Sequence, residues 1–209
     1  MTSEKIVAEK LLQINAIRLN VQNPFTWVSG WKSPIYCDNR RILSFPYVRD
    51  FIKSEISNIV FSAYPDTDAI AGVATAGIPH GVLVADQLKL PFIYVRSSAK
   101  GHGLGNQIEG HLEAGQKVVV IEDLISTGKS SLAACKALQE AGAVVIGLVS
   151  VFNYGFDIAV KAFAEAGIPF RSLSNYEVLI DLAAEKGNIA PEDLAALRKW
   201  RKAPESYSL

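Results

Sequence analysis

Two adjacent carboxylates, Glu122 and Asp123, follow a run of β-branched residues at positions 118–121. Such a run is typical of a buried strand, so the two acids are expected where a strand of a sheet ends. Carboxylate oxygens accept hydrogen bonds from hydroxyl groups, and they are also the hard ligands that Mg²⁺ prefers. The pair therefore suits the two hydroxyls of a ribose, and Asp123 also qualifies as a ligand for Mg²⁺.

The segment after the acids, residues 124–131, is rich in small and hydroxyl-bearing side chains. A helix that begins here would present free backbone N–H groups and the positive end of its dipole to an anion. Gly128 allows the backbone to close around that anion. Hydroxyl donors come from Ser126, Thr127 and Ser130. The acid pair and the turn together suit a ribose 5-phosphate. The alternative is that the segment has only a structural role, as an N-capped helix after a strand with the two acids at the rim of the sheet.

Two common nucleotide-binding motifs do not fit this chain. Thr127-Gly128-Lys129-Ser130 ends like a Walker A loop, but that motif needs a glycine where this sequence has Asp123. Gly103 and Gly105 have the spacing of a dinucleotide-binding fingerprint, whose third glycine position is Ile108 here. Neither motif therefore explains these segments.

Apolar runs alternate with helical patterns around the acid pair, and this alternation predicts the fold. Continuous runs of this kind are buried on both faces, which is typical of a parallel sheet flanked by helices, an α/β fold. The expected strands cover residues 69–73, 91–95, 117–121 and 144–152, and the expected helices cover 5–20, 47–63, 79–88 and 131–141. Residues 23–34 contain Pro, Gly and Ser and are expected to form turns with short hairpin strands. Ligands bind such folds beyond the carboxyl ends of the strands, so the segments 74–77, 96–110 and 122–130 are the ones to inspect.

Composition narrows the class of protein further. The 209 residues suffice for one domain, or for one domain with an added lobe. The formal net charge is zero, which argues against general binding to nucleic acid or to an anionic membrane. Cys37 and Cys135 form no CxxC pair and only three histidines occur, so a zinc site is not expected. Reduced cysteines, an N-terminus without a signal core and the absence of a membrane-length apolar stretch favour the cytoplasm.

The segment 118–131 resembles the phosphoribosyl pyrophosphate (PRPP) signature of the phosphoribosyltransferases with an α/β core. Two further segments narrow the resemblance to the orotate phosphoribosyltransferases. Phe25–Tyr36 resembles the N-terminal motif on the orotate side, and Tyr94–Gly103 resembles the mobile catalytic loop. The resemblance runs in order from about residue 25 to residue 152, and the tail 172–187 fits as well. It implies a single domain over 1–209, with an N-terminal helix and hood over about 1–45 and the α/β core with C-terminal helices over about 46–209.

The resemblance also implies an activity. Members of this family transfer the phosphoribosyl group from PRPP to orotate, which gives orotidine 5′-monophosphate and pyrophosphate in pyrimidine synthesis. They use Mg²⁺, held mainly by PRPP, and they are homodimers with shared active sites. Neither nucleic acid nor a membrane is implied as a partner.

The same resemblance assigns roles to individual residues of this sequence. Glu122 and Asp123 would hold the ribose hydroxyls. The 5-phosphate would be wrapped by Leu124, Ile125, Ser126, Thr127, Gly128, Lys129 and Ser130. Pyrophosphate would meet the loop of Thr75, Ala76 and Gly77. The loop residues Arg96, Lys100 and His102 would close over PRPP and, with Asp123, form the catalytic set. Orotate would contact Ser126, Ser29, Lys32 and Tyr36.

Elementary chemistry supports the loop roles. Breaking the bond to pyrophosphate builds negative charge on the leaving group, which Arg96, Lys100 and Mg²⁺ can stabilise. His102 can supply a further donor or a proton. Glycines at 101, 103 and 105 would let the loop close and exclude water. Without the motif, Arg96 and Lys100 would be read as ordinary solvated charges.

The sequence departs from its relatives at several of these positions. Many relatives have a second basic residue where this chain has Ser97, and a Lys-Asp-His order where it has Gly101 between the lysine and the histidine. Some carry a lysine at the position of Val28 and an arginine near Asn153 or Tyr154 that contacts orotate. The side chains that contact the pyrimidine are therefore left open. Trp27 and Trp31 either line the base site or pack the N-terminal lobe, and the helix around Trp200 is expected to pack on the body of the protein.

Two alternative functions share part of the pattern. A purine phosphoribosyltransferase would share the PRPP turn, but it would not explain Phe25–Tyr36 or the Lys100-Gly101-His102 loop. A regulator that senses PRPP without catalysis usually adds a DNA-binding module. Residues 1–24 are too few and too weakly basic for a helix-turn-helix.

Overall fold

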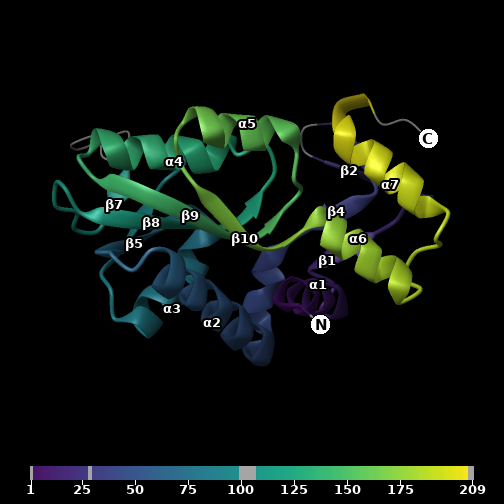
Figure 1. The fold of residues 1–209 in the computed structure, drawn as a ribbon, viewed down its shortest axis with the longest axis horizontal. Coiled ribbons are helices and arrows are strands. Elements are labelled where there is room, and N and C mark those ends of the chain that lie inside the picture. Colours follow the sequence, from purple (N-terminus) through teal and green to yellow (C-terminus); the bar gives the residue numbers. More distant parts are fainter. Residues whose placement is uncertain (1, 28–29, 99–106, 207–209) are drawn as a thin grey trace.

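A six-stranded sheet with the order β10-β9-β8-β5-β6-β7 forms the centre of the molecule (Figure 1). The computed structural model describes residues 2–27, 30–98 and 107–206. All neighbouring strands of this sheet are parallel except β7, which is antiparallel to β6. The strands are β5 (Ala69–Val73), β6 (Phe92–Val95), β7 (Ile108–Glu109), β8 (Lys117–Ile125), β9 (Val144–Asn153) and β10 (Phe170–Asn175). The predicted α/β fold with a mostly parallel sheet is confirmed.

Helices cover both faces of this sheet. Helices α2 (Pro46–Ala63) and α3 (Gly77–Leu88) lie on one face, and α4 (Lys129–Glu140) and α5 (Asp157–Glu165) lie on the other (Figure 1). Alternate residues of β8 enter the two cores: Val119 and Ile121 pack with α2 and α3, whereas Val118 and Val120 pack with α4 and α5. Burial on both sides explains why the sequence of this strand is continuously apolar. In the described part of the chain, no helix is long and apolar enough to span a membrane.

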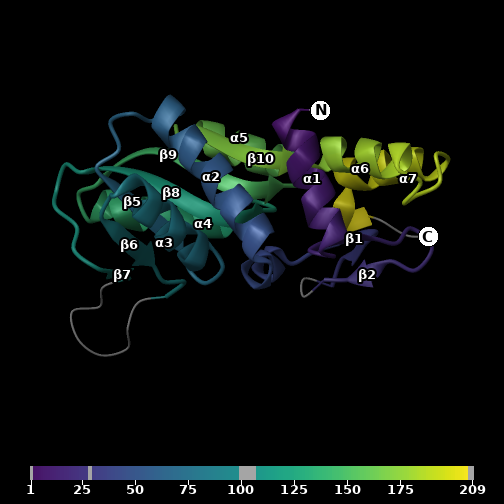
Figure 2. The same cartoon turned by 90° about the horizontal axis from the view of Figure 1, so that it is seen from below.

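A smaller lobe, which we call the hood, is built from both ends of the chain. Strand β1 (Ile17–Leu19) pairs antiparallel with β4 (Ile35–Cys37), and β2 (Phe25–Thr26) pairs antiparallel with β3 (Lys32–Ser33). The β2–β3 pair confirms the short hairpin strands predicted within residues 23–34, whereas β1 lies where a helix was expected. Three helices lie beside these strands (Figures 1 and 2): α1 (Ser3–Gln13), α6 (Tyr176–Glu185) and α7 (Asp193–Lys202). The 3₁₀ helix η1 (Asn39–Ser44) connects the hood to α2, and η2 (Pro204–Ser206) follows α7. Helix α6 packs against α1, and Trp200 of α7 donates a hydrogen bond to Lys32 of β3, so both ends of the chain meet in the hood.

Several predicted boundaries were wrong. The helix expected over 5–20 ends at Gln13, because Asn15 has a φ of 53°, a left-handed conformation that cannot continue a right-handed helix. The strand expected over 117–121 continues to Ile125, since it stays paired with β9 as far as Asn153. The acid pair therefore belongs to β8 itself, and the next helix begins at Lys129, two residues earlier than expected.

Candidate active site

The loop that follows β5 lies directly against the acid pair. It comprises Ala74, Thr75 and Ala76, its Ala74–Thr75 peptide bond is cis, and helix α3 begins at Gly77. A Cβ atom at Gly77 would lie 2.5 Å from the carbonyl oxygen of Ile121. Only glycine permits this approach, which places the start of α3 against the backbone just before Glu122. The loop 74–77 and the acids of β8 therefore meet at one edge of the sheet.

The two carboxylates have different surroundings. Glu122 is only 5 % exposed, and its carboxylate accepts hydrogen bonds from the Ser131 hydroxyl and from the Asp123 backbone N–H, both at 3.0 Å. Burial raises the pKa of Glu122 well above its usual value, and the neighbouring charge of Asp123 adds to this effect. Burial also raises the pKa of Asp123, while a hydrogen bond with the Glu122 carboxyl group and, to a smaller extent, the nearby Arg40 oppose that rise. Glu122 is thus tied to the first turn of α4, and Asp123 is the more accessible acid.

A buried asparagine joins the hood to the acid pair. The Asn39 side-chain amide donates to the backbone oxygen of Asp123 at 2.7 Å. Asn39 in turn accepts a weak hydrogen bond from the Cys37 thiol at 3.4 Å. Burial raises the pKa of that thiol well above its usual value, so the sulfur stays protonated. Sequence reasoning missed this contact, because a single asparagine carries no signal for a partner 84 residues away.

The turn between β8 and α4 has the conformation that an anion site requires. Gly128 has a φ of 78°, and a Cβ atom there would lie 2.8 Å from the Phe163 ring. The carbonyl of Gly128 accepts the first helical hydrogen bond, from Leu132 at 2.9 Å. Lys129 and Ser130 are exposed. The Ile125 side chain is buried in the core, so Ile125 can contact an anion in the turn only through its backbone. The first N–H groups of α4 therefore open toward this turn.

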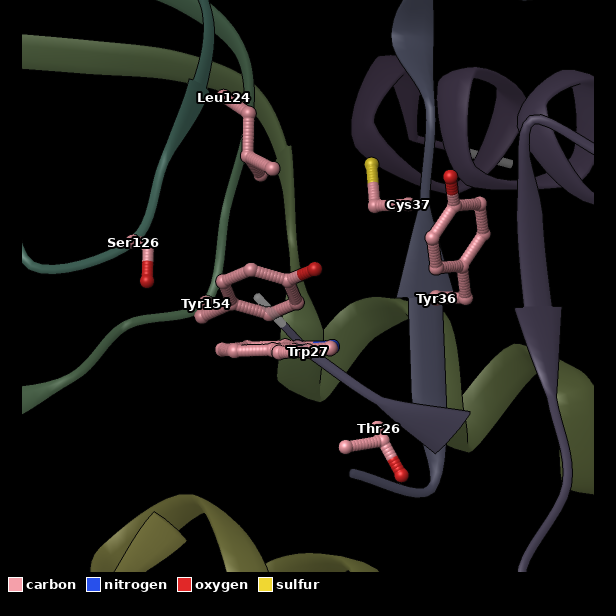
Figure 3. A pocket seen from close by; sticks show the side chains of 7 residues that line it. All are labelled: Thr26, Trp27, Tyr36, Cys37, Leu124, Ser126 and Tyr154. Carbon is pink, nitrogen blue, oxygen red and sulfur yellow. The ribbon is translucent and has the colours of Figure 1, made fainter. Parts of the chain in front are cut away.

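An apolar cavity of about 250 Å³ lies beside the turn, between the hood and the sheet (Figure 3). Its lining residues come from β2, β4 and β8 and from the segments that follow them and β9: Thr26, Trp27, Tyr36, Cys37, Leu124, Ser126 and Tyr154. Of the expected orotate contacts, Ser126 and Tyr36 are brought together here. Lys32 does not line the cavity; its ammonium group donates to the hydroxyl of Thr26 at 2.8 Å. Ser29 lies outside the described residues.

Aromatic rings fix one wall of this cavity. Trp27 packs against Tyr154 with 5.2 Å between ring centroids, and its indole N–H donates to the backbone oxygen of Ile35 at 3.1 Å. Trp200 of α7 packs edge-on against Trp27 and donates to the backbone oxygen of Lys32 at 3.1 Å. Trp31 stacks on Trp27 but does not line the cavity. Trp27 thus lines the site, and the C-terminal helix holds it in place.

Arg96 borders a second, smaller cavity of about 90 Å³ whose lining also includes Ala74 and Ser130. Its guanidinium lies 3.6 Å from the Glu109 carboxylate, and its backbone N–H donates to Gln107 at 2.9 Å. This cavity brings the β5 loop, the start of α4 and Arg96 to one place. Lys100 and His102 lie outside the described residues. Within the described ranges, no group of three or more His, Cys, Asp or Glu side chains could hold a metal ion.

The core of the chain matches a known domain family. Residues 42–164 match the phosphoribosyl transferase domain, and this stretch contains the β5 loop, the acid pair and the turn before α4. Fold and central site together define a phosphoribosyltransferase.

Full-length relatives narrow the class. The chain is 58 % identical over 206 residues to the orotate phosphoribosyltransferase of Phocaeicola vulgatus, covering 99 % of this chain and 97 % of the relative. It is 55 % identical to that of Bacillus subtilis, covering 97 % and 94 %. The solved orotate phosphoribosyltransferase of Aeropyrum pernix superposes with a TM-score of 0.75 at 27 % identity, covering 88 % of this chain and 99 % of that one. This chain belongs to the orotate phosphoribosyltransferase family, as the resemblance of its motifs predicted.

Proposed function

We propose that this chain transfers the phosphoribosyl group of PRPP to orotate in the cytoplasm, forming orotidine 5′-monophosphate and pyrophosphate for pyrimidine synthesis. One observation carries the proposal: the aromatic cavity adjoins the acid pair and the turn before α4. Leu124 follows the acids directly and Ser126 begins the turn, yet both line the cavity. A planar base in the cavity would therefore lie beside a ribose and phosphate held by the same segment.

The acid pair and the turn hold the ribose 5-phosphate. Asp123 accepts hydrogen bonds from ribose hydroxyls, because it is the more accessible of the two acids. Glu122 keeps that edge of β8 in place through Ser131 and the Asp123 backbone. The phosphate lies at the N-terminus of α4, where free N–H groups and the hydroxyls of Ser126, Thr127 and Ser130 surround it.

Positively charged side chains and backbone N–H groups near the β5 loop stabilise the pyrophosphate that leaves. As the bond between the sugar and pyrophosphate breaks, negative charge grows on the pyrophosphate oxygens. Arg96 stabilises that charge, and the resemblance adds Lys100 and His102. The small side chains of residues 74–77 leave the backbone N–H groups free to approach the oxygens.

Mg²⁺ fits this site as an ion brought mainly by PRPP. A dedicated protein site would need several carboxylates, whereas the described residues offer the Asp123 carboxylate as a hard oxygen donor beside the ribose position. Mg²⁺ would supply positive charge to the pyrophosphate oxygens. We further propose a homodimer in which the loop 96–110 of each chain closes over the active site of its partner and excludes water.

A spectrophotometric assay tests the proposal. Orotate absorbance should fall when PRPP and Mg²⁺ are added to the protein, and excess chelator should abolish the change. Adenine and hypoxanthine should not be consumed. Turnover of a purine without turnover of orotate would overturn the substrate assignment, and full activity in excess chelator would overturn the role of Mg²⁺.

A further inference from the structure

Tyr154 places a polar group in the wall of an otherwise apolar cavity. The residue is only 2 % exposed, and its ring is enclosed by Trp27, Phe152, Phe156 and Trp200. Figure 3 shows its hydroxyl projecting into the cavity, toward the side where Cys37 and Tyr36 lie. Among the described residues, no group forms a hydrogen bond with this hydroxyl, and a ligand in the cavity can reach it.

Two donors of the cavity wall already have partners. The Trp27 indole N–H donates to the backbone oxygen of Ile35, and the Cys37 thiol donates to Asn39. Four hydroxyls of the lining can still donate to a ligand: those of Thr26, Tyr36, Ser126 and Tyr154. Of these four residues, only Tyr154 is buried.

We propose that the Tyr154 hydroxyl donates a hydrogen bond to an oxygen atom of the bound pyrimidine and so helps to select orotate. This inference rests on the proposed function. The pyrimidine of orotate carries carbonyl and carboxylate oxygens, all of which accept hydrogen bonds. Trp27 packs on the Tyr154 ring and forms the adjoining wall of the cavity, while the hydroxyl at the edge of the tyrosine ring can donate to the oxygens of the base. Tyr154 is thus a neutral specificity residue, at a position where some relatives carry a charged one.

The hydroxyl remains a donor at any pH where the enzyme would work. Burial, followed by the neighbouring Cys37, Tyr176 and Asp123, raises the pKa of Tyr154 well above the usual value of a phenol. The proton therefore stays on the oxygen at neutral and moderately alkaline pH.

The test is Tyr154→Phe, which removes the hydroxyl and keeps every ring contact. We expect the KM for orotate to rise about ten-fold, because an oxygen of the base loses its partner in a desolvated site. The KM for PRPP should stay within about two-fold of wild type. Binding of orotidine 5′-monophosphate, followed by tryptophan fluorescence, should weaken by a similar factor as the KM for orotate.

Tyr176→Phe is the matched control. Tyr176 belongs to the same aromatic cluster, is fully buried and donates to the backbone of Leu197 at 3.1 Å, but it does not line the cavity. Its loss should lower stability and leave the KM for orotate unchanged. Less than a two-fold rise in that KM for Tyr154→Phe, or an equal rise in both variants, would overturn the inference. Because KM does not depend on the folded fraction, poor folding cannot imitate the effect; a wild type without orotate turnover would instead refute the proposed function.

Discussion

Glu122 and Asp123 are neighbours in the sequence, yet the structure gives them different tasks. Glu122 is held inward by hydrogen bonds from Ser131 and from the backbone. Asp123 keeps an accessible carboxylate, and its backbone oxygen is fixed by Asn39. At the scale of single residues, one acid therefore positions the strand edge and the other is available to substrate.

Asp123→Asn should weaken the use of PRPP while the fold survives. The variant loses a charge-assisted hydrogen bond to the ribose, worth roughly 1.5–3 kcal/mol, so kcat/KM for PRPP should fall about ten- to hundred-fold. Steady-state kinetics at saturating orotate measure this, with thermal unfolding as the check on folding. Unchanged kinetics toward PRPP would show that the acid pair has only a structural role.

Glu122→Gln should alter how stability depends on pH. A carboxyl group whose pKa is raised by folding stabilises the folded state fully below its unfolded pKa, about 4.3, and that contribution is lost as the pH rises through the raised value. The free energy of unfolding of the ligand-free wild type should therefore decline above about pH 4. Glutamine does not titrate, so the decline should be smaller in the variant. Urea unfolding across this pH range measures both slopes, and identical slopes would contradict the raised pKa.

At the scale of elements, the turn between β8 and α4 depends on one glycine. Gly128→Ala meets two penalties: a positive φ, which costs about 1–2 kcal/mol for an L-residue, and a clash with the Phe163 ring. We expect a loss of stability beyond the φ penalty and a raised KM for PRPP, because the turn must shift.

Gly167→Ala is the control for this substitution. Gly167 also has a positive φ, 66°, but no atom lies within 4 Å of the added Cβ. Only the φ penalty should remain, and the KM for PRPP should not change. Equal effects of the two substitutions on stability and on KM would mean that the Phe163 contact does not shape the turn.

The core elements could be predicted from the sequence because their apolar runs are continuous. The strands β5, β6, β8 and β9 were found this way, since burial on both faces leaves a strong local signal. The apolar residues around 14–20 led to a wrong prediction of helix. Asn15, which has a left-handed conformation, separates helix α1 from strand β1, and that strand also carries apolar residues, Ile17 and Leu19. Strand β10 was missed: its sequence, from Phe170 to Asn175, is mostly polar.

The site was predictable only in part, for a related physical reason. The acid pair and the turn form one contiguous segment, so their types and order are visible in the sequence. The cavity is assembled from four separate segments, and no local pattern links Cys37 or Tyr154 to Ser126. The end of the apolar run at 144–152 was the available signal for Tyr154, because residues at that edge of a parallel sheet face the ligand.

At the scale of the whole molecule, the hood needs both ends of the chain. Trp200 near the C-terminus donates to Lys32 near the N-terminus and packs against Trp27 and Tyr154. The cavity that we propose for the base is therefore completed only when helix α7 is in place. The proposed dimer extends this arrangement, since the loop of one chain would complete the site of another.

Mixing two impaired variants tests the shared site. Lys100→Ala removes a loop cation and Asp123→Asn damages the ribose contact, so a hybrid dimer would contain one site with neither defect. Random exchange gives hybrids in about half of the dimers, and about a quarter of wild-type activity is the ceiling if the sites are independent. No recovery after verified subunit exchange would mean that the loop serves its own chain or that the protein is a monomer.

The most direct measurement is an experimental structure with orotidine 5′-monophosphate bound. We expect the pyrimidine in the cavity against Trp27 and Tyr154, the ribose hydroxyls at Asp123, and the phosphate at the N–H groups of the turn before α4. A base bound outside the cavity, or a phosphate bound away from residues 126–130, would contradict the proposed site.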